Sequence, residues 1–244
     1  MTEQKAFASR VIHTPGFAIQ SWQPGHHGLS KTLRVYIEGD GRAWSRKGRP
    51  SSDPTPRNRL VHNLMLSDPK PDIAYLARPC QFQQDPHCNT ETWTFGRYDN
   101  SVIQSMSRAL DTLKQSGEYQ QLELVGYSGG ATIALLLAAR RNDILSIRTI
   151  AGNLDPAFTN RYHRVSPMPS AMNPVHFTDR LQKVPQLHFY GTDDEVIPAA
   201  VSRHYLSLFR NRSCIQLEPV VGASHGEGWA EGWGQLLSRT VSCY

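Results

Sequence analysis

Several features that would assign the chain to a particular class of protein are missing from its sequence. No apolar run reaches the roughly 18 residues that a transmembrane helix needs, so no membrane span is expected. The opening decapeptide MTEQKAFASR has no apolar core, so it is not expected to act as a signal peptide. There is no fixed-period repeat and no long low-complexity tract. No C-x-x-C pair and no nucleic-acid-binding signature is present, so neither a zinc site nor a nucleic-acid partner is expected.

The chain is poor in lysine and rich in arginine. Of its 26 basic residues 20 are arginine, and against 21 acidic residues they give a formal net charge of +5. One segment holds a basic cluster interleaved with proline and serine: Arg42, Arg46, Lys47, Arg49, Arg57 and Arg59. This cluster either attracts an anionic substrate or surface, or forms a solvated, flexible loop. The sequence leaves both alternatives open.

Apolar runs of two kinds alternate along the 244 residues. Continuous runs typical of buried strands, each with the turn or loop that follows it, occur at 33–41, 72–80, 122–130, 147–154, 185–194 and 213–226. Helices are predicted between them or after them, at 101–115, 131–141, 199–209 and 229–241. This alternation predicts a mostly parallel sheet with helices on both faces, in a single α/β domain of residues 1–244. Residues 10–22 are expected to add an antiparallel hairpin at one edge.

The pentapeptide Gly126-Tyr127-Ser128-Gly129-Gly130 carries the strongest chemical signal. It follows the apolar strand LELV and opens the apolar helix ATIALLLAAR, which is the context that a G-x-S-x-G nucleophile elbow requires. Glycine has no Cβ, so strand and helix can approach each other across a sharp turn. We therefore expect Ser128 to project beyond the sheet and the Gly129 N–H to face a developing oxyanion. Tyr127 is expected to contact the substrate.

With this motif the chain resembles the α/β-hydrolase superfamily from about residue 33 to its C-terminus. The resemblance implies a three-layer α/β-hydrolase fold and the chain order nucleophile, acid, histidine. The segment GTDDEVIP (191–198) ends a strand and is similar to the family's G-x-x-D-x-V-x-P turn. That similarity assigns the triad acid to Asp194. Asp155, which follows the preceding strand, is the alternative acid.

The resemblance also implies a catalytic histidine in a loop of small residues before the last helix. His225 lies in such a loop, GASHG (222–226), directly after the last strand. By contrast, His188 lies inside an apolar strand, where a hydrogen-bonded core histidine is expected. Ser128, Asp194 and His225 are therefore expected to form a catalytic triad.

A second oxyanion donor is expected in the turn Glu38-Gly39-Asp40-Gly41, after the first buried strand. The family often has His-Gly here, so the pair Glu38-Gly39 is a departure from its pattern. Because a backbone N–H donates to the oxyanion, a changed side chain does not abolish the function. Alignment to the turn assigns the donor to Asp40, with Gly41 as the alternative donor and a substrate contact. The Asp40 carboxylate is then expected to point away from the oxyanion.

The four cysteines permit two disulfides with three possible connectivities. Cys80 and Cys88 lie in one loop, while Cys214 opens the last strand and Cys243 closes the helix that returns from it. This topology favours the pairs Cys80–Cys88 and Cys214–Cys243, and with them an exported location, periplasmic or secreted. Four reduced thiols in a cytosolic enzyme are the alternative.

These assignments predict a serine hydrolase that cleaves a small or medium ester through an acyl-enzyme, without a metal or organic cofactor. Residues 155–185 stand where the fold places its lid. Their larger apolar side chains are expected either to form an acyl pocket or to pack onto the core: Phe158, Tyr162, Met168, Met172 and Phe177. A thioesterase, acyltransferase or peptidase with the same triad is the alternative enzyme, and a hydrolase-like binding protein is the alternative without catalysis. The oligomeric state is not predicted.

Overall fold

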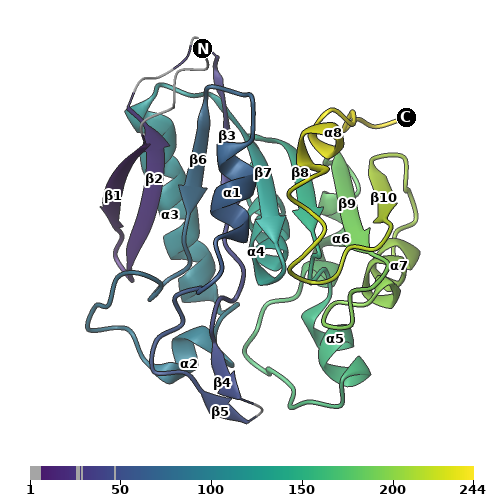
Figure 1. Ribbon diagram of the computed structural model, residues 1–244, viewed down its shortest axis with the longest axis horizontal. Helices are drawn as coiled ribbons and strands as arrows, with labels where there is room; N and C mark the ends of the chain where they lie inside the picture. Colours follow the sequence, from purple (N-terminus) through teal and green to yellow (C-terminus); the bar gives the residue numbers. More distant parts are fainter. Residues whose placement is uncertain (1–6, 26–27, 29, 47) are drawn as a thin grey trace.

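The computed structural model describes residues 7–25, 28, 30–46 and 48–244. Its central sheet consists of β1 (Phe7–His13), β2 (Ala18–Pro24), β3 (Thr32–Ile37), β6 (Ile73–Leu76), β7 (Gln121–Tyr127), β8 (Ile144–Ile150), β9 (Gln186–Gly191) and β10 (Ile215–Val220). The strand order is β1-β2-β6-β3-β7-β8-β9-β10 (Figure 1). The pairs β1–β2 and β2–β6 are antiparallel, and all other neighbours in this sheet are parallel. The predicted mostly parallel sheet and its edge hairpin are therefore confirmed.

Helices connect most of the parallel strands. They are α1 (Leu60–Leu66), α2 (Thr90–Trp93), α3 (Asn100–Ser116), α4 (Gly129–Ala138), α5 (Pro156–Tyr162), α6 (Thr178–Leu181), α7 (Ala199–Ser207) and α8 (Trp233–Leu237), with a 3₁₀ turn η1 (Pro174–Phe177). In the part of the chain that the structure describes, none of these helices has the length and apolarity to cross a bilayer. The last helix is much shorter than the predicted 229–241. Its N-cap is Gly232, and glycine costs about 1 kcal/mol more than alanine inside a helix.

The side chains of each strand alternate between two buried cores, one on each face of the sheet. Val35 and Ile37 pack with residues of α3 and α4, whereas Tyr36 packs with residues of α1 and α8. Figure 1 shows these two helix pairs on opposite faces of the sheet. Successive residues of a strand point to opposite faces of the sheet. Because both odd and even positions are apolar, helices cover both faces, which gives three layers.

All polar residues predicted for the site follow parallel strands, at the edge of the sheet where the carboxyl ends meet. Ser128 follows β7, Asp194 follows β9, and the loop that holds His225 follows β10. Beyond this edge lie α2, α5 and a separate two-stranded hairpin of β4 (Trp44–Arg46) and β5 (Arg49–Pro50) (Figure 1). The parallel topology thus brings residues from three distant segments to one side of the molecule.

Two disulfides are formed, Cys80–Cys88 and Cys214–Cys243, as the topology favoured. The first lies in the loop between β6 and α2. The second joins the start of β10 to residues that follow α8, rather than to that helix itself, and Tyr244 donates a backbone hydrogen bond to Ser213 at 2.9 Å. The C-terminal segment is therefore fixed against the edge strand.

Replacing Cys214 and Cys243 together by serine is expected to lower the free energy of unfolding by about 3 kcal/mol. The cross-link joins residues 29 positions apart, and closing that loop removes conformational entropy from the unfolded chain. Urea denaturation without reductant, followed by tryptophan fluorescence, measures the difference. A change below about 0.5 kcal/mol would contradict this account.

Candidate active site

Ser128 occupies a sharp turn between β7 and α4. Its backbone has φ 50° and ψ −119°, a left-handed conformation that costs a residue with a Cβ roughly 1–3 kcal/mol. Ser128 N donates to Ile150 O at 3.0 Å, and Asn153 N donates to Ser128 O at 3.0 Å, so β8 and the loop after it hold the turn. A Cβ at Gly126 would lie 2.6 Å from Gly130 O, which explains why the motif needs glycine there. The predicted strand–turn–helix context is present.

The imidazole of His225 lies between the Ser128 hydroxyl and the Asp194 carboxylate. Its Nε2 is 3.1 Å from Ser128 Oγ, and its Nδ1 is 2.9 Å from Asp194 Oδ2. The other carboxylate oxygen of Asp194 accepts hydrogen bonds from the N–H groups of Val196 and Ile197, at 2.9 and 2.8 Å. The Asp194 side chain is fully buried and that of His225 is 22% exposed. The structure therefore brings together the three side chains that the sequence selected, with the histidine open to the pocket.

Asp155, the alternative acid, has different partners. Its Oδ2 lies 3.2 Å from His204 Nε2, and its Oδ1 accepts from the Phe158 N–H at the start of α5 and from the Asn173 side chain. Phe158 also stacks on the His204 ring, with the two ring planes 13° apart. Asp155 therefore caps α5 and anchors α7, whereas Asp194 contacts His225.

Tyr127 lies beneath the histidine loop. Its hydroxyl donates to His225 O at 3.1 Å, and the two rings are 5.3 Å apart. Burial, together with the nearby carboxylates of Glu38 and Asp194, raises the Tyr127 pKa, so the phenol keeps its proton at neutral pH. Tyr127 thus positions the loop of His225, in addition to the substrate contact predicted for it.

Several backbone N–H groups near Ser128 have no acceptor among the described residues. In the turn after β3, the Gly39 N–H donates to Glu38 Oε1 and the Arg42 N–H donates to Pro54 O, both at 2.8 Å. Neither Asp40 nor Gly41 donates its N–H to any described residue, and the same holds for Gly129 at the start of α4. The N–H groups of the predicted donors Asp40 and Gly129 and of the alternative Gly41 are therefore free of hydrogen bonds to other described residues, as is that of Gly130, and their role as oxyanion donors stays a prediction.

A pocket of about 500 Å³ opens over Ser128. Its lining comes from the turn after β3, from the nucleophile elbow, from the loops after β9 and β10, and from residues 56–58. The lining residues are Glu38, Asp40, Gly41, Arg42, Pro56, Arg57, Asn58, Tyr127, Ser128, Val196 and His225. Gly129 is absent from this lining, although its N–H starts the helix behind Ser128. The pocket therefore has a polar and basic wall beside the candidate triad.

The insert 155–185 contributes no side chain to this pocket. Met168, Met172 and Phe177 pack against the larger core, and Phe158 stacks on His204. Tyr162 is half exposed and contacts Phe158 and His163. Of the two alternatives that the sequence left open, packing describes most of these side chains, and none of them lines the pocket over Ser128. The role of the insert as a lid stays a prediction.

The family model for serine hydrolase (FSH1) matches residues 64–219, a stretch that contains both Ser128 and Asp194. The chain belongs to the FSH1 serine hydrolase family. His225 lies just beyond the matched residues, and the structure alone shows that it reaches Ser128. No curated protein matches the sequence.

Solved structures are similar to this FSH1-family hydrolase over almost its whole length. Est1E from Butyrivibrio proteoclasticus with bound ferulic acid has a TM-score of 0.67 at 15% identity, covering 93% of this chain and 97% of that one. The Pyrococcus furiosus esterase Pf2001 has 0.66 at 15% identity, covering 96% and 90%. A putative dienelactone hydrolase from Klebsiella pneumoniae has 0.64 at 17% identity, covering 95% and 96%. At such low identity the likeness shows the fold alone, and it confirms the predicted α/β-hydrolase fold.

The Asp40 carboxylate of the FSH1-family chain is held by two arginines and a tyrosine. Arg97 Nε lies 2.9 Å from Asp40 Oδ2, Arg78 Nη1 lies 3.2 Å from Oδ1, and the Tyr98 hydroxyl lies 3.2 Å from Oδ1. A Cβ at Gly129 would overlap this carboxylate, so the second glycine of the elbow makes room for it. Two guanidinium groups against one carboxylate leave a positive charge behind the turn after β3, which favours a developing oxyanion. No sequence motif marks Arg78, Arg97 or Tyr98, so none of them was predicted as a site residue.

Glu38 explains the departure from the family's His-Gly turn. Its side chain is buried and folds back on its own turn, where Oε1 accepts from the Gly39 N–H at 2.8 Å and Oε2 lies 2.6 Å from the Tyr75 hydroxyl. Burial raises the Glu38 pKa to about 7, although both hydrogen bonds and Arg78 act in the opposite direction. The carboxylate therefore orients the turn that holds Asp40.

The free energy of unfolding of the wild-type hydrolase is expected to fall as the pH rises, because Glu38 loses its proton. In Glu38→Gln this fall should be absent. The folded-state pKa of about 7 exceeds an unfolded value of about 4.3, so the folded protein binds the proton more tightly. The resulting stabilisation is complete below the unfolded pKa and is lost as the pH rises through 7, for a total of roughly 3 kcal/mol. Glutamine copies the protonated acid at every pH.

Urea denaturation of both proteins at about pH 5, 6.5 and 8 tests this prediction. The difference in unfolding free energy is expected to move in favour of the variant between the first and the last pH. A difference that stays constant across this range would show that Glu38 keeps an ordinary pKa.

Proposed function

We propose that this serine hydrolase cleaves a small or medium carboxylic ester, with Ser128 as nucleophile, His225 as base and Asp194 as the acid that orients it. One observation carries the proposal: the two ring nitrogens of His225 lie within hydrogen-bond distance of Ser128 Oγ and Asp194 Oδ2 at once. Such a relay generates a nucleophile from an ordinary hydroxyl group. The membership of the FSH1 family supports the same reaction class.

In the first half of the reaction, Ser128 Oγ attacks the ester carbonyl and His225 Nε2 takes the hydroxyl proton. Asp194 holds the Nδ1 proton, which fixes the tautomer and stabilises the imidazolium. The tetrahedral intermediate collapses when the alcohol leaves as its oxygen accepts the proton from Nε2. A water molecule then gives a proton to Nε2 and attacks the acyl-enzyme, and Ser128 regains its proton as the carboxylic acid is released.

The oxyanion of both intermediates binds to the N–H groups of Gly129 and Asp40. Neither group has a hydrogen-bond partner among the described residues, so no existing bond has to break. Donors of this kind each contribute roughly 3 kcal/mol to transition-state stabilisation in other hydrolases. The guanidinium groups of Arg78 and Arg97 neutralise the Asp40 carboxylate, which would otherwise repel the oxyanion.

A fluorophosphonate probe and a panel of matched substrates test the proposal together. The probe is expected to label Ser128, located by peptide mass spectrometry, and a p-nitrophenyl ester is expected to be hydrolysed. Parallel assays with a thioester, an amide and an ester plus a competing alcohol separate an esterase from a thioesterase, a peptidase and an acyltransferase. An unlabelled Ser128 and an uncleaved panel would favour the hydrolase-like binding protein.

The location of the protein is also proposed from its chemistry. Both cysteine pairs form disulfides, and structural disulfides persist in oxidising compartments. We infer an exported location, periplasmic or secreted.

A further inference from the structure

Two neighbouring pockets share one arginine and are lined with others. The pocket over Ser128 and His225 includes Arg42 and Arg57 in its wall. A second pocket, of about 580 Å³, is lined by Arg42 together with Arg46 and Arg49 of the β4–β5 hairpin. Arg42 therefore links the candidate catalytic pocket to a basic hollow beside it.

The acidic residues of these two linings are already engaged. Only Glu38 and Asp40 are acidic among the described residues that line them. Glu38 is buried against Tyr75, and burial raises its pKa to about 7, so it carries little negative charge below that pH. Asp40 is paired with Arg78 and Arg97. Neither carboxylate is left to neutralise the arginines of the pocket wall.

The four arginines of the wall, Arg42, Arg46, Arg49 and Arg57, form no ion pair and no side-chain hydrogen bond with any residue that the structure describes. Arg34, Arg141 and Arg239, in contrast, each contact a carboxylate at 2.9 Å or less. Unpaired arginines that line two adjoining pockets create a positive potential there, which a small anion can satisfy. The four side chains are therefore suited to bind a ligand.

The backbone that carries these arginines is tied to the rest of the protein. Arg42 N donates to Pro54 O at 2.8 Å and Ser51 N donates to Ala43 O at 3.0 Å, which closes the hairpin segment. The Trp93 indole N–H donates to Ser51 O at 3.2 Å, and Trp44 packs edge-on against Phe95. Arg46 and Arg49 of the basic cluster thus lie in the short β4–β5 hairpin, whereas Arg57 and Arg59 lie outside it. Lys47 lies outside the described residues.

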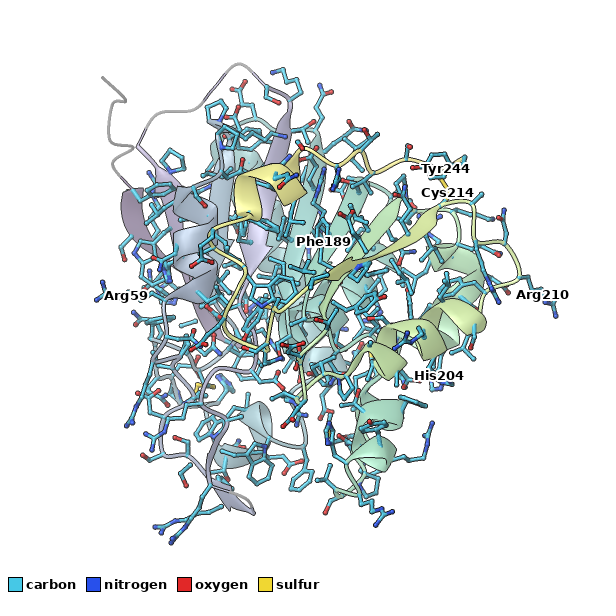
Figure 2. The ribbon with its side chains drawn as sticks, turned by 45° about the vertical axis from the view of Figure 1, so that its right-hand side comes forward. Arg59, Phe189, His204, Arg210, Cys214 and Tyr244 are labelled. Carbon is cyan, nitrogen blue, oxygen red and sulfur yellow. A yellow bond between two sulfur atoms is a disulfide. The ribbon has the colours of Figure 1, made fainter. Side chains whose placement is uncertain are left out.

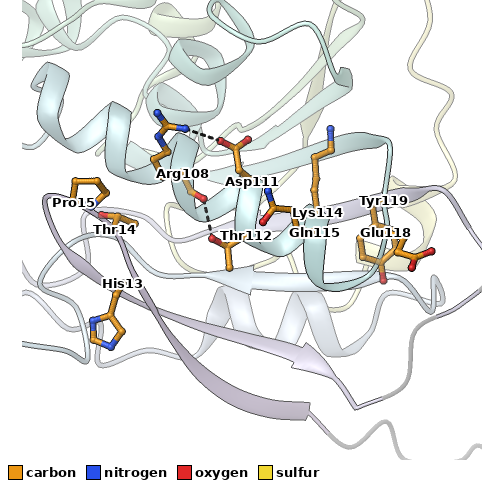
Figure 3. Close-up of a pocket in the computed structure, with 10 residues that line it drawn as sticks. All are labelled: His13, Thr14, Pro15, Arg108, Asp111, Thr112, Lys114, Gln115, Glu118 and Tyr119. Carbon is orange, nitrogen blue, oxygen red and sulfur yellow. Dashed lines mark hydrogen bonds and ion pairs between the residues drawn. The ribbon is translucent and has the colours of Figure 1, made fainter.

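Another pocket, larger than the one over Ser128, has a different character. It has a volume of about 710 Å³ and lies between the end of β1 and helix α3 (Figure 3). Its lining includes both signs of charge, and Arg108 pairs with Asp111 at 3.8 Å. It shares no residue with the pocket over Ser128. Size alone therefore does not identify a substrate site here, whereas the basic pocket adjoins the candidate triad.

We propose that the substrate of this hydrolase carries a carboxylate, which Arg42 and Arg57 bind while the ester carbonyl meets Ser128. This inference rests on the proposed function and specifies the substrate class for it. Arg42 follows the turn of Asp40 directly, so an anionic group one short chain away from the carbonyl reaches its guanidinium. The hairpin arginines Arg46 and Arg49 extend the positive field outward and attract the anion from solution.

Matched esters test the charge preference. The p-nitrophenyl monoester of glutaric acid carries a carboxylate on its acyl side, a 4-butyryloxybenzoate carries one on its alcohol side, and p-nitrophenyl butyrate is neutral. The wild-type kcat/KM is expected to favour one of the two anionic esters over the neutral ester by about tenfold, and less so in 0.5 M NaCl. Preference for either anionic ester supports the proposal and shows which part of the substrate faces Arg42.

Variants of the wall locate the effect. Arg42→Gln and Arg57→Gln are each expected to lower the ratio of anionic to neutral kcat/KM by about three- to tenfold, whereas Arg42→Lys keeps much of it. Arg210→Gln is the control: it removes an exposed arginine on the opposite side of the molecule from Arg59, as Figure 2 shows, and should leave the ratio unchanged. A wild-type preference for the neutral ester overturns the proposal. So does a ratio of anionic to neutral kcat/KM that is the same in Arg42→Gln and Arg57→Gln as in the wild type.

A binding measurement separates this proposal from the catalytic one. Monomethyl glutarate is expected to bind the Ser128→Ala protein more tightly than methyl butyrate does in calorimetric titration, and Arg42→Gln should weaken only the former. If the anion binds and no ester is cleaved by the wild type, the anion site stands and the proposed hydrolysis fails. If the wild type cleaves neutral esters and neither monomethyl glutarate nor the 4-butyryloxybenzoate binds the Ser128→Ala protein, the hydrolase stands and the anion site is wrong.

Discussion

Ser128→Ala is expected to lower kcat for a p-nitrophenyl ester by about 10⁴-fold or more, because no other group replaces the nucleophile. His225 Nε2 lies 3.1 Å from Ser128 Oγ, so the proton and its acceptor are already aligned. Alanine keeps a Cβ on the strained turn at φ 50° and removes only the oxygen. Stability is therefore expected to stay close to that of the wild type, and the loss to be purely catalytic.

Stopped or continuous absorbance assays with purified protein measure this loss, with circular dichroism to show that the fold is intact. Ser238→Ala is a suitable control, since its hydroxyl is exposed and donates only to Gln235 O within α8 and its cap. Activity of Ser128→Ala within tenfold of the wild type would sink the assignment of the nucleophile. The same variant should also lose labelling by a fluorophosphonate.

Asp194→Asn is expected to lower kcat by about 10³- to 10⁴-fold with little change of KM. An asparagine still accepts the N–H groups of Val196 and Ile197 through one oxygen, so the turn should keep its shape. Its NH₂ group, however, would face His225 Nδ1, which lies 2.9 Å from Oδ2 in the wild type. The imidazole must then carry its proton on Nε2, where it can no longer accept the proton of Ser128.

Asp155→Asn provides the matched comparison, because Asp155 is the other carboxylate that the chain order allowed. Asparagine caps a helix about as well as aspartate, so α5 should remain folded. Asp155 contacts His204 at 3.2 Å and shares no hydrogen-bond partner among the described residues with the His225–Asp194 pair. The kcat of Asp155→Asn is therefore expected to stay within about threefold of the wild-type value. If instead Asp155→Asn abolished activity and Asp194→Asn kept it, the two carboxylates would have to exchange roles.

The residues of the candidate site that could be predicted share one property: each follows a strand directly. Ser128 was marked by glycines that a turn between strand and helix requires, and a Cβ at Gly126 indeed leaves no room there. Asp194 and His225 were marked by small or turn-forming neighbours after β9 and β10. Because parallel strands place their carboxyl ends at one edge, local patterns were enough to predict that these side chains meet.

Other parts of the site depend on packing between segments without any motif. Arg78 follows β6 and Arg97 precedes α3, and the two meet at Asp40 only in the folded chain. The two alternatives for the insert stayed open for the same reason: apolar residues such as Met168 and Phe177 are equally suited to line a cavity or to fill a core. Composition gives no sign of which of these a side chain will do.

The sequence by itself determined the strands of the parallel sheet, the longer helices between them, the disulfide pairing that topology favours and the three residues of the candidate triad. Each of these follows from local constraints: apolar periodicity, glycine at a turn without space for a Cβ, and the edge at which a strand ends. The tertiary structure decided the charge around the catalytic pocket. It buried Glu38, neutralised Asp40 with two arginines and left Arg42 and Arg57 without a partner among the described residues. Charge balance is a sum over side chains that only folding brings within a few ångströms of one another, and no stretch of sequence contains that sum.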